Sequence, residues 1–266
     1  MKNIFLLFLF TSIALAGGSQ LEMLLEGQDA TMVIYDENEQ NYLILNEGRA
    51  TERFSPFSTH KVPHSLIALE TGLVPNIDSL LSWDQDRYPK QDWWPKSWEG
   101  SHNLRSAIKV SLVPAYREMA RQAGEETMRT YLKKFQFGNS DVSSGLDSYW
   151  LNGSLKISAM EQVKFMERFF NHQFRLKLST TLAVREIMVR EETDVYTFSH
   201  KTGTGTIDQE TEKAIAWLVG YIERDKNVYF FAFNMDAENF NEAVEKRMEL
   251  ATEILAKAGL IDKKSP

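Results

Sequence analysis

The sequence of 266 residues contains no cysteine. Disulfide bonds, a thiol nucleophile, thiolate metal sites and a lipidated N-terminal cysteine are therefore excluded. The protein must rely on its hydrophobic core, and 43% hydrophobic with 25% charged residues is the balance of a globular chain. The length favours one large domain or two small lobes.

An excess of positive charge is also absent, because the formal net charge is −7. A nucleic-acid-binding surface usually carries a lysine and arginine excess that neutralises phosphates. We therefore expect no nucleic-acid partner.

Histidine is scarce, and the five histidines do not follow the spacing of a metal site. His60 and His64 are four residues apart, but Pro63 lies between them and no glutamate accompanies them. We expect no metal ion in this protein.

Long apolar runs are confined to the N-terminus, where Lys2 precedes an apolar stretch from Ile4 to Ala14. Ala14 and Ala16 complete the pattern of a secretory signal, so residues 1–16 are predicted to be cleaved. Loss of the one positive charge of Lys2 would change the net charge from −7 to about −8. No later stretch reaches 18 apolar residues, so we expect a secreted protein without a stable membrane anchor, with the periplasm as its compartment.

Strand patterns occur at both ends of the remaining chain, with helical patterns between them. This order predicts an α+β fold in which an antiparallel β-sheet is flanked by helices and carries an inserted helical lobe. We expect residues 17–266 to form one catalytic domain. The predicted strands are 32–35, 42–45, 195–206, 214–223 and 227–236, with a hairpin turn at 224–227.

Helix signals are strongest where a capping residue precedes an apolar pattern. Ser158 and Glu161 have the spacing of a capping box, and Pro114 suits the first turn of a helix. The other predicted helices cover 65–73, a segment opening at Ser101, a segment opening at Ser179, and 243–258.

The segment 82–100 contains four tryptophans and two prolines among many charges. This composition predicts a long irregular loop. Its aromatic residues suit either a loop that packs on itself or the wall of a substrate groove.

Ser58 and Lys61 stand three residues apart just before an apolar helical run. Serine is a weak nucleophile until a nearby base takes its proton, and lysine can be that base only when it is uncharged. Pro63 must lie in or near the first helical turn, which places Ser58 at the helix entrance. If that turn is a 3₁₀ helix, residues i and i+3 eclipse and Lys61 lies directly against Ser58. By itself the pair also fits an ordinary solvated serine and lysine.

A second short motif, Lys-Thr-Gly at 201–203, lies on a predicted strand and is followed by Thr204 and Gly205. It suits an edge strand along which a substrate backbone docks, because Gly203 permits close approach and Lys201 supplies positive charge. Alone it equally fits a surface strand before a turn.

Together, S-x-x-K followed downstream by K-T-G is typical of the penicillin-recognising serine enzymes. Nearly the whole mature sequence resembles the class D serine β-lactamases, or oxacillinases. The similar blocks are STHKVPHSLIALETG at 58–72, SLV at 111–113, FGN at 137–139, DSYWLNGSLKISAMEQVKF at 147–165, KTGTG at 201–205 and WLVGYIERDKNVYFFAFNMD at 217–236.

The resemblance implies a role for each matching residue. Ser58 would be the nucleophile that forms an acyl-enzyme with the lactam carbonyl. Lys61 would bind CO2 as an N-carbamate (N6-carboxylysine) and act as general base in acylation and deacylation. Trp150 would hold that carbamate through its indole N–H, and Ser111 would pass a proton to the leaving lactam nitrogen. Apart from CO2 or bicarbonate, no cofactor is implied.

The resemblance also implies how a β-lactam substrate is bound. Val113 and Leu151 would pack over the carbamate, and the backbone N–H groups of Ser58 and Thr204 would form an oxyanion hole, worth about 3 kcal/mol per donor. Arg247 would pair with the carboxylate of the drug. Lys201, Thr202 and Gly203 would line the carboxylate side of the site.

Two residues depart from the family pattern. His60 replaces the usual phenylalanine beside the lysine, and Phe137 replaces the usual tyrosine. Both changes are expected to weaken carbamylation or turnover.

Two other functions share these motifs. A β-lactam sensor domain is acylated without useful deacylation, and a membrane anchor with a cytoplasmic partner would distinguish it. A cell-wall peptidase or transpeptidase would usually carry extra domains or a tether. The expected oligomeric state is a monomer or a homodimer.

Overall fold

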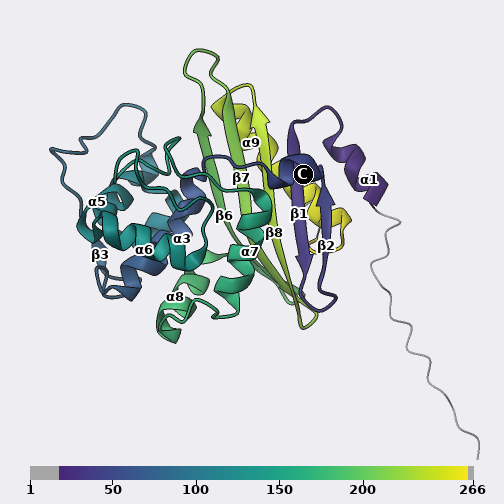
Figure 1. The fold of residues 1–266 in the computed structure, drawn as a ribbon, viewed down its shortest axis with the longest axis horizontal. Helices are drawn as coiled ribbons and strands as arrows, with labels where there is room; N and C mark the ends of the chain where they lie inside the picture. Colours follow the sequence, from purple (N-terminus) through teal and green to yellow (C-terminus); the bar gives the residue numbers. More distant parts are fainter. Residues whose placement is uncertain (1–17, 263–266) are drawn as a thin grey trace, which may run out of the picture.

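The computed structural model describes residues 18–262 and contains a six-stranded antiparallel sheet (Figure 1). The strand order is β2-β1-β8-β7-β6-β5. The predicted signal sequence, residues 1–16, lies outside the described residues. The strands are β1 (Ala30–Asp36), β2 (Asn41–Leu45), β5 (Val189–Glu192), β6 (Tyr196–Thr206), β7 (Ala214–Arg224) and β8 (Asn227–Ala237), and β3 (Leu80–Leu81) and β4 (His102–Asn103) form a separate short ladder.

Helices cover both faces of the sheet and form a lobe beside it, which confirms the predicted α+β fold. In Figure 1, α3, α5, α6 and α8 gather on one side of the sheet, while α9 lies behind its long strands. The α-helices are α1 (Gly18–Glu22), α2 (Glu47–Thr51), α3 (Lys61–Glu70), α4 (Leu104–Val110), α5 (Val113–Ala123), α6 (Glu125–Phe135), α7 (Ala159–Phe170), α8 (Leu178–Met188) and α9 (Phe240–Lys257). The 3₁₀ helices are η2 (Met23–Leu25), η3 (Phe57–His60) and η4 (Lys96–Trp98).

Successive residues of the central strands point into two different hydrophobic cores, because side chains alternate across a sheet. Trp217 and Val219 of β7 belong to the core shared with the helical lobe. Ala216 and Leu218 belong to the core beneath α9. Burial on both faces explains the nearly continuous apolar sequence of β7 and β8.

Several helix boundaries differ from the sequence-based prediction: α3 covers Lys61–Glu70 rather than 65–73, α9 covers Phe240–Lys257 rather than 243–258, and the strand β5 is not among the predicted strands. Two further differences change a cap and divide a helix. The cap before α4 is Asn103, whose side chain accepts from the Ser106 N–H in a full capping box, so the predicted cap at Ser101 is wrong. The segment opening at Pro114 divides at Gly124 into α5 and α6, and that glycine has a φ of 81°. The predicted capping box of Ser158 and Glu161 is confirmed at α7.

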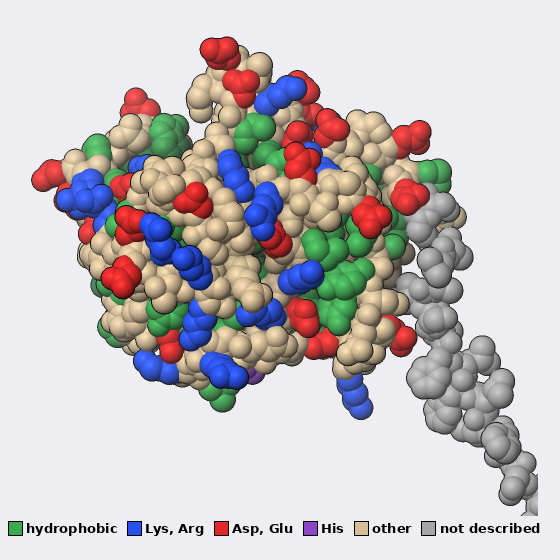
Figure 2. All heavy atoms as spheres, viewed as in Figure 1, with side chains coloured by type: hydrophobic (Ala, Val, Ile, Leu, Met, Phe, Trp, Pro, Cys, Tyr) green, Lys and Arg blue, Asp and Glu red, His purple; other side chains and the backbone are tan. Residues whose placement is uncertain are grey.

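Within the described part of the chain, no helix is both long and apolar enough to cross a bilayer. Acidic and basic side chains both occur on the face shown in Figure 2.

Candidate active site

Ser58 and Lys61 meet at the junction of a 3₁₀ helix and an α-helix. Ser58 lies in η3, and Lys61 is the first residue of α3. Residues three apart eclipse in a 3₁₀ turn, and here Lys61 Nζ donates to Ser58 Oγ at 2.9 Å. The close approach predicted from the spacing is therefore present. Ser58 is partly exposed, whereas Lys61 is fully buried.

The burial of Lys61 changes its acid–base chemistry. Desolvation penalises the ammonium form and lowers the pKa of Lys61 from 10.5 to about 7. No carboxylate within the described residues forms an ion pair with it. The amine beside Ser58 therefore changes from charged to neutral around pH 7, instead of staying charged as an exposed lysine would.

The Lys-Thr-Gly motif lies on β6, beside η3. Strand β5 pairs with β6 through residues 197–199, and among the described residues no strand pairs with the outer side of 200–206. A Cβ on Gly203 would lie 2.8 Å from Pro56 O and 3.2 Å from Thr59 N. Only glycine therefore lets β6 pack so closely against the turn that carries Ser58. The predicted edge strand is confirmed for this half of β6.

Lys201 joins this strand to the helical lobe. Its Nζ donates to Ser111 Oγ at 2.6 Å and to Thr202 O at 2.8 Å. Ser111 ends α4 in the left-handed region, with φ 58°, a conformation that non-glycine residues adopt only when their surroundings hold them there. Burial first, and then the charges of Lys61, Arg190 and Arg247, lower the pKa of Lys201 well below its usual value.

Arg247 reaches the same strand from α9. Its guanidinium donates to Gly203 O at 3.4 Å and to Thr204 Oγ1, and only 7% of the residue is exposed. Burial lowers the pKa of Arg247 to about 10. Its Nε has no hydrogen-bond partner in the described structure. From sequence alone Arg247 resembles a helix-surface charge, yet it is a buried cation directed at β6.

Trp150 is fully buried and is connected through the backbone to the turn that carries Ser58. Its carbonyl oxygen accepts from the N–H of Phe57 at 3.0 Å. Its indole Nε1 is buried without a hydrogen-bond partner in the described structure, which leaves one donor free for a ligand. A buried lysine with a lowered pKa and no carboxylate partner, together with a free indole N–H, are the groups that a carbamate on Lys61 requires. The residues present therefore fit the CO2 modification implied by the resemblance.

The two departures from the family pattern contact one another. His60 and Phe137 pack edge to face with their ring centroids 5.9 Å apart, and both side chains are fully buried. His60 also stacks on Trp150, with the two ring centroids 5.1 Å apart.

Val113 and Leu151 are both partly buried and pack against the core. Val113 also lines a hollow of about 300 Å³ formed with the loop 82–100.

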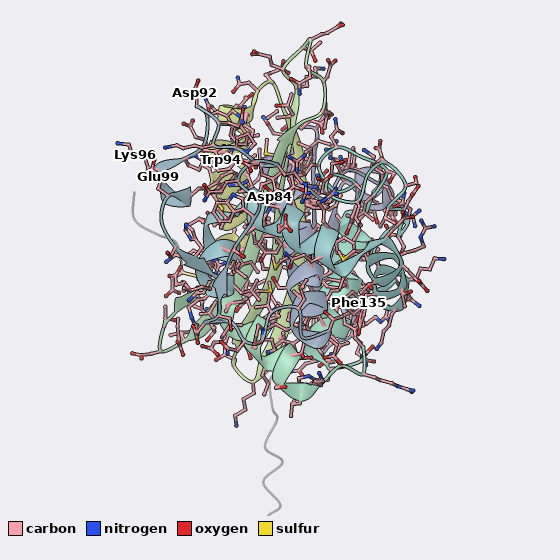
Figure 3. The ribbon with its side chains drawn as sticks, turned by 90° about the vertical axis from the view of Figure 1, so that its left-hand side faces the viewer. Asp84, Asp92, Trp94, Lys96, Glu99 and Phe135 are labelled. Carbon is pink, nitrogen blue, oxygen red and sulfur yellow. The ribbon has the colours of Figure 1, made fainter. Side chains whose placement is uncertain are left out.

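The tryptophans of the loop 82–100 pack on one another. The ring centroids of Trp94 and Trp98 are 5.3 Å apart, and both rings contact the ring of Trp93. Figure 3 shows Asp92, Lys96 and Glu99 at the outer edge of the loop and Trp94 nearer the protein body. The loop packs on itself, as one of the two sequence-based interpretations predicts, and it also lines a hollow. Its role as the wall of a substrate groove stays a prediction.

Two residues near the site were missed by sequence reasoning. Arg190 of β5 is one of the positive charges that lower the pKa of Lys201, and nothing in its local sequence signals that role. His64 packs against Trp150 with ring centroids 5.6 Å apart. The spacing of His64 from His60 suggests a metal motif at most, and it gives no sign of the contact with Trp150. Among the described residues, no group of three or more histidines, aspartates or glutamates suits a metal ion.

Comparisons with known proteins agree with this geometry. The penicillin binding protein transpeptidase domain matches residues 30–256. The chain is 38% identical over 237 residues to beta-lactamase OXA-19 from Pseudomonas aeruginosa, covering 89% of this chain and 86% of that protein.

Two solved structures are similar over almost the whole fold. The class D β-lactamase FUS-1 (OXA-85) from Fusobacterium nucleatum subsp. polymorphum has a TM-score of 0.84 and 36% identity, covering 92% of this chain and 99% of the other. The C-terminal domain of the Bacillus licheniformis BlaR penicillin-receptor has a TM-score of 0.82 and 33% identity, covering 91% of this chain and 95% of the other. With its S-x-x-K and K-T-G residues brought together in one site, this chain belongs to the penicillin-binding protein transpeptidase domain family and, within it, to the class D β-lactamases.

Proposed function

We propose that this protein hydrolyses β-lactams through an acyl-enzyme on Ser58, with Lys61 as the position of the general base. The observation that carries the proposal is the 2.9 Å contact between Ser58 Oγ and a buried lysine Nζ without a carboxylate partner. The class D relatives support the same activity.

Acylation begins when the base at position 61 accepts the Ser58 hydroxyl proton. Ser58 Oγ then bonds to the lactam carbonyl carbon, and the carbon–nitrogen bond of the ring breaks. Ser111 is placed to give a proton to the departing nitrogen, because its hydroxyl accepts from Lys201 and keeps its own proton to donate. The base then passes the proton from Ser58 to Ser111, so that both groups are restored. In deacylation, water loses a proton to the base and adds to the ester carbon, and the base gives that proton to Ser58 Oγ as the ester bond breaks.

Lys61 is a chemically suitable site for CO2 because burial lowers its pKa to about 7, so a large fraction of the amine is uncharged near neutral pH. With CO2 bound, the lysine nitrogen would carry an anionic carbamate that serves as general base. Trp150 Nε1 would donate to it, and Val113 and Leu151 would restrict water around it. The backbone N–H groups of Ser58 and Thr204 are proposed to stabilise the oxyanion.

The test of the activity is steady-state turnover of a chromogenic cephalosporin by purified protein in buffer containing bicarbonate. Sustained turnover with many product molecules per protein is expected. Hydrolysis no faster than in a Ser58→Ala sample would contradict the proposal.

A sensor is the second candidate, because the BlaR penicillin-receptor domain has nearly the same fold. A sensor would be acylated once and remain acylated. The lifetime of the acyl-enzyme therefore separates the two functions.

Replacing Arg247 with alanine should raise KM about 10- to 100-fold with a smaller effect on kcat. The buried guanidinium is proposed to pair with the substrate carboxylate, and a charge-assisted hydrogen bond contributes about 1.5–3 kcal/mol. Steady-state kinetics would measure this change. Lys246→Ala is the matched control on α9, because Lys246 forms an exposed ion pair with Glu242. An unchanged KM in Arg247→Ala would show that this arginine does not bind substrate.

Export is proposed from the N-terminal sequence, with cleavage after Ala16. Mass spectrometry of protein recovered from an expressing bacterium should give an N-terminus at Gly17. Intact Met1 in a soluble cytosolic fraction would end this proposal.

A further inference from the structure

Two buried imidazoles flank the side chain of Lys61. His60 precedes Lys61 and His64 follows it by about one helical turn, and their exposed fractions are 0% and 1%. His64 packs edge to face on Tyr116 with ring centroids 5.2 Å apart. Lys61 Nζ lies 5.2 Å from the centre of the same Tyr116 ring. His64 and the lysine amine therefore contact the same ring, and the charge of Lys61 acts on His64. We call the buried group of Lys61, His60, His64, Tyr116 and Trp150 the compartment.

Much of the hydrogen-bonding capacity of this compartment is unused. Within the described structure, His60 Nδ1, both ring nitrogens of His64 and the indole Nε1 of Trp150 are buried without partners. A neutral imidazole always carries one N–H donor, so His64 has a free donor in either tautomer. Leaving such a group unpaired costs about 1–3 kcal/mol. A phenylalanine would fill the same space without this cost, and the unpaired donors of the two rings are available to a ligand.

The other nitrogen of His60 is already engaged. His60 Nε2 lies 3.2 Å from the hydroxyl of Tyr149, and the ring stacks on Trp150 with an interplanar angle of 16°. This contact fixes the imidazole against the indole. The sequence alone suggests that a polar ring at position 60 weakens the base, but this ring is buried and held in place. We therefore interpret His60 as a support of the pocket.

The charge of this compartment favours an anionic ligand. The ionisable groups that face the two imidazoles are Lys61 on α3, Tyr116 on α5 and Tyr149 before Trp150, and none is a carboxylate. Burial first, and then the positive charge of Lys61, lower the pKa of His64 to about 3. Burial first, and then the charges of His64 and Lys61, lower the pKa of His60.

This coupling is reciprocal, because two charges affect each other equally. A positive charge at Lys61 opposes protonation of the imidazoles, so a negative charge there must favour it. Conversion of Lys61 from a cation to an anion would raise the pKa of both rings.

We propose that His60 and His64 are positioning residues for the anionic form of Lys61. His64 donates an N–H hydrogen bond to the carbamate oxygens beside the indole N–H of Trp150, and His60 holds that indole in place. The inference rests on the proposed function, because it requires CO2 to bind Lys61. In that reaction the amine lone pair bonds to the carbon of CO2, one carbon–oxygen π pair becomes the oxyanion, and the nitrogen releases one proton to water.

The test uses ¹³C-labelled bicarbonate and NMR spectroscopy of the whole protein, which detects the carbamate without any turnover. Half-saturation of the carbamate signal should need about tenfold more bicarbonate in His64→Phe, because the ring shape is kept and the donor is lost. His64→Asn retains an N–H donor and should recover most of the loss. Equal bicarbonate dependence in wild type and His64→Phe would overturn the inference.

A second readout does not depend on the folding of a His64 variant. In wild-type protein with ¹⁵N-labelled histidine, the His64 ring signals should shift when bicarbonate is added, and in Lys61→Ala they should not. Unchanged ring signals at a saturated carbamate signal would overturn the inference. If wild-type protein gives no carbamate signal, both this inference and the proposed carbamate on Lys61 are wrong. The proposed acyl-enzyme would then still be tested separately by covalent labelling of Ser58 with penicillin.

Discussion

Replacing Ser58 with alanine should abolish covalent labelling by penicillin and lower turnover by at least about 10⁴-fold. The hydroxyl of Ser58 is the proposed nucleophile and lies 2.9 Å from the buried amine of Lys61, so without it no acyl-enzyme should form. Intact-protein mass spectrometry after incubation with benzylpenicillin measures the adduct, and chromogenic turnover measures the rate.

The chain offers a matched control for this experiment in a second serine–lysine contact. Lys156 Nζ donates to Ser55 Oγ at 2.7 Å, but Ser55 is only 1% exposed and is not accessible to a substrate. Ser55→Ala should therefore keep both the adduct and turnover. An adduct of unchanged yield in Ser58→Ala would place the nucleophile elsewhere.

Replacing Lys61 with alanine should slow both acylation and deacylation by about 10²–10⁴-fold each, the usual contribution of a general base. The side chain is fully buried and its Nζ is hydrogen-bonded to Ser58 Oγ, so the substitution removes the proposed base from the nucleophile. Stopped-flow acylation and the decay of the isolated acyl-enzyme would measure the two steps. Lys156→Ala is the control, because it removes a lysine from the second serine contact.

The pH dependence gives an independent check on Lys61. Burial lowers its pKa to about 7, so the unmodified amine becomes neutral and able to accept a proton as the pH rises through 7. In CO2-free buffer, acylation should therefore increase with pH around 7. A rate that does not change between pH 6 and 8 would show that the amine is not the base under those conditions.

Trp150→Phe separates the hydrogen bond from the packing. It removes the indole N–H and keeps an aromatic ring between His60 and His64, whereas Trp150→Ala would also leave a cavity that costs about 3–5 kcal/mol. We expect continued acylation and a long-lived acyl-enzyme. Mass spectrometry of the acyl-enzyme over time would measure its decay, and wild-type decay rates in Trp150→Phe would contradict a role for this N–H.

Local sequence signals predicted much of the fold because their physical causes are local. The aromatic and threonine residues of β6 and the turn before β8 are signals that depend on neighbouring residues alone. The contact between Ser58 and Lys61 follows from a 3₁₀ turn placed before Pro63. In contrast, the choice of Asn103 rather than Ser101 as the cap of α4 depends on the tertiary course of the loop that precedes it.

The site itself was predictable only where family motifs mark it. Arg247 has no local signal, because its burial arises when α9 packs behind β6, far away in the sequence. The role of His64 depends on Tyr116 and Trp150, which approach it from two other segments. Such residues are recognised in the folded structure by their unpaired buried hydrogen-bond donors, and not by the spacing of residues in the sequence.

The lifetime of the acyl-enzyme in saturating bicarbonate tests the central claim most directly. Wild-type protein mixed with excess benzylpenicillin should show a Ser58 adduct that disappears as the drug is consumed, with many product molecules released per protein. A stoichiometric adduct that persists after the free drug is removed, with no further product, would contradict hydrolysis and identify a β-lactam sensor.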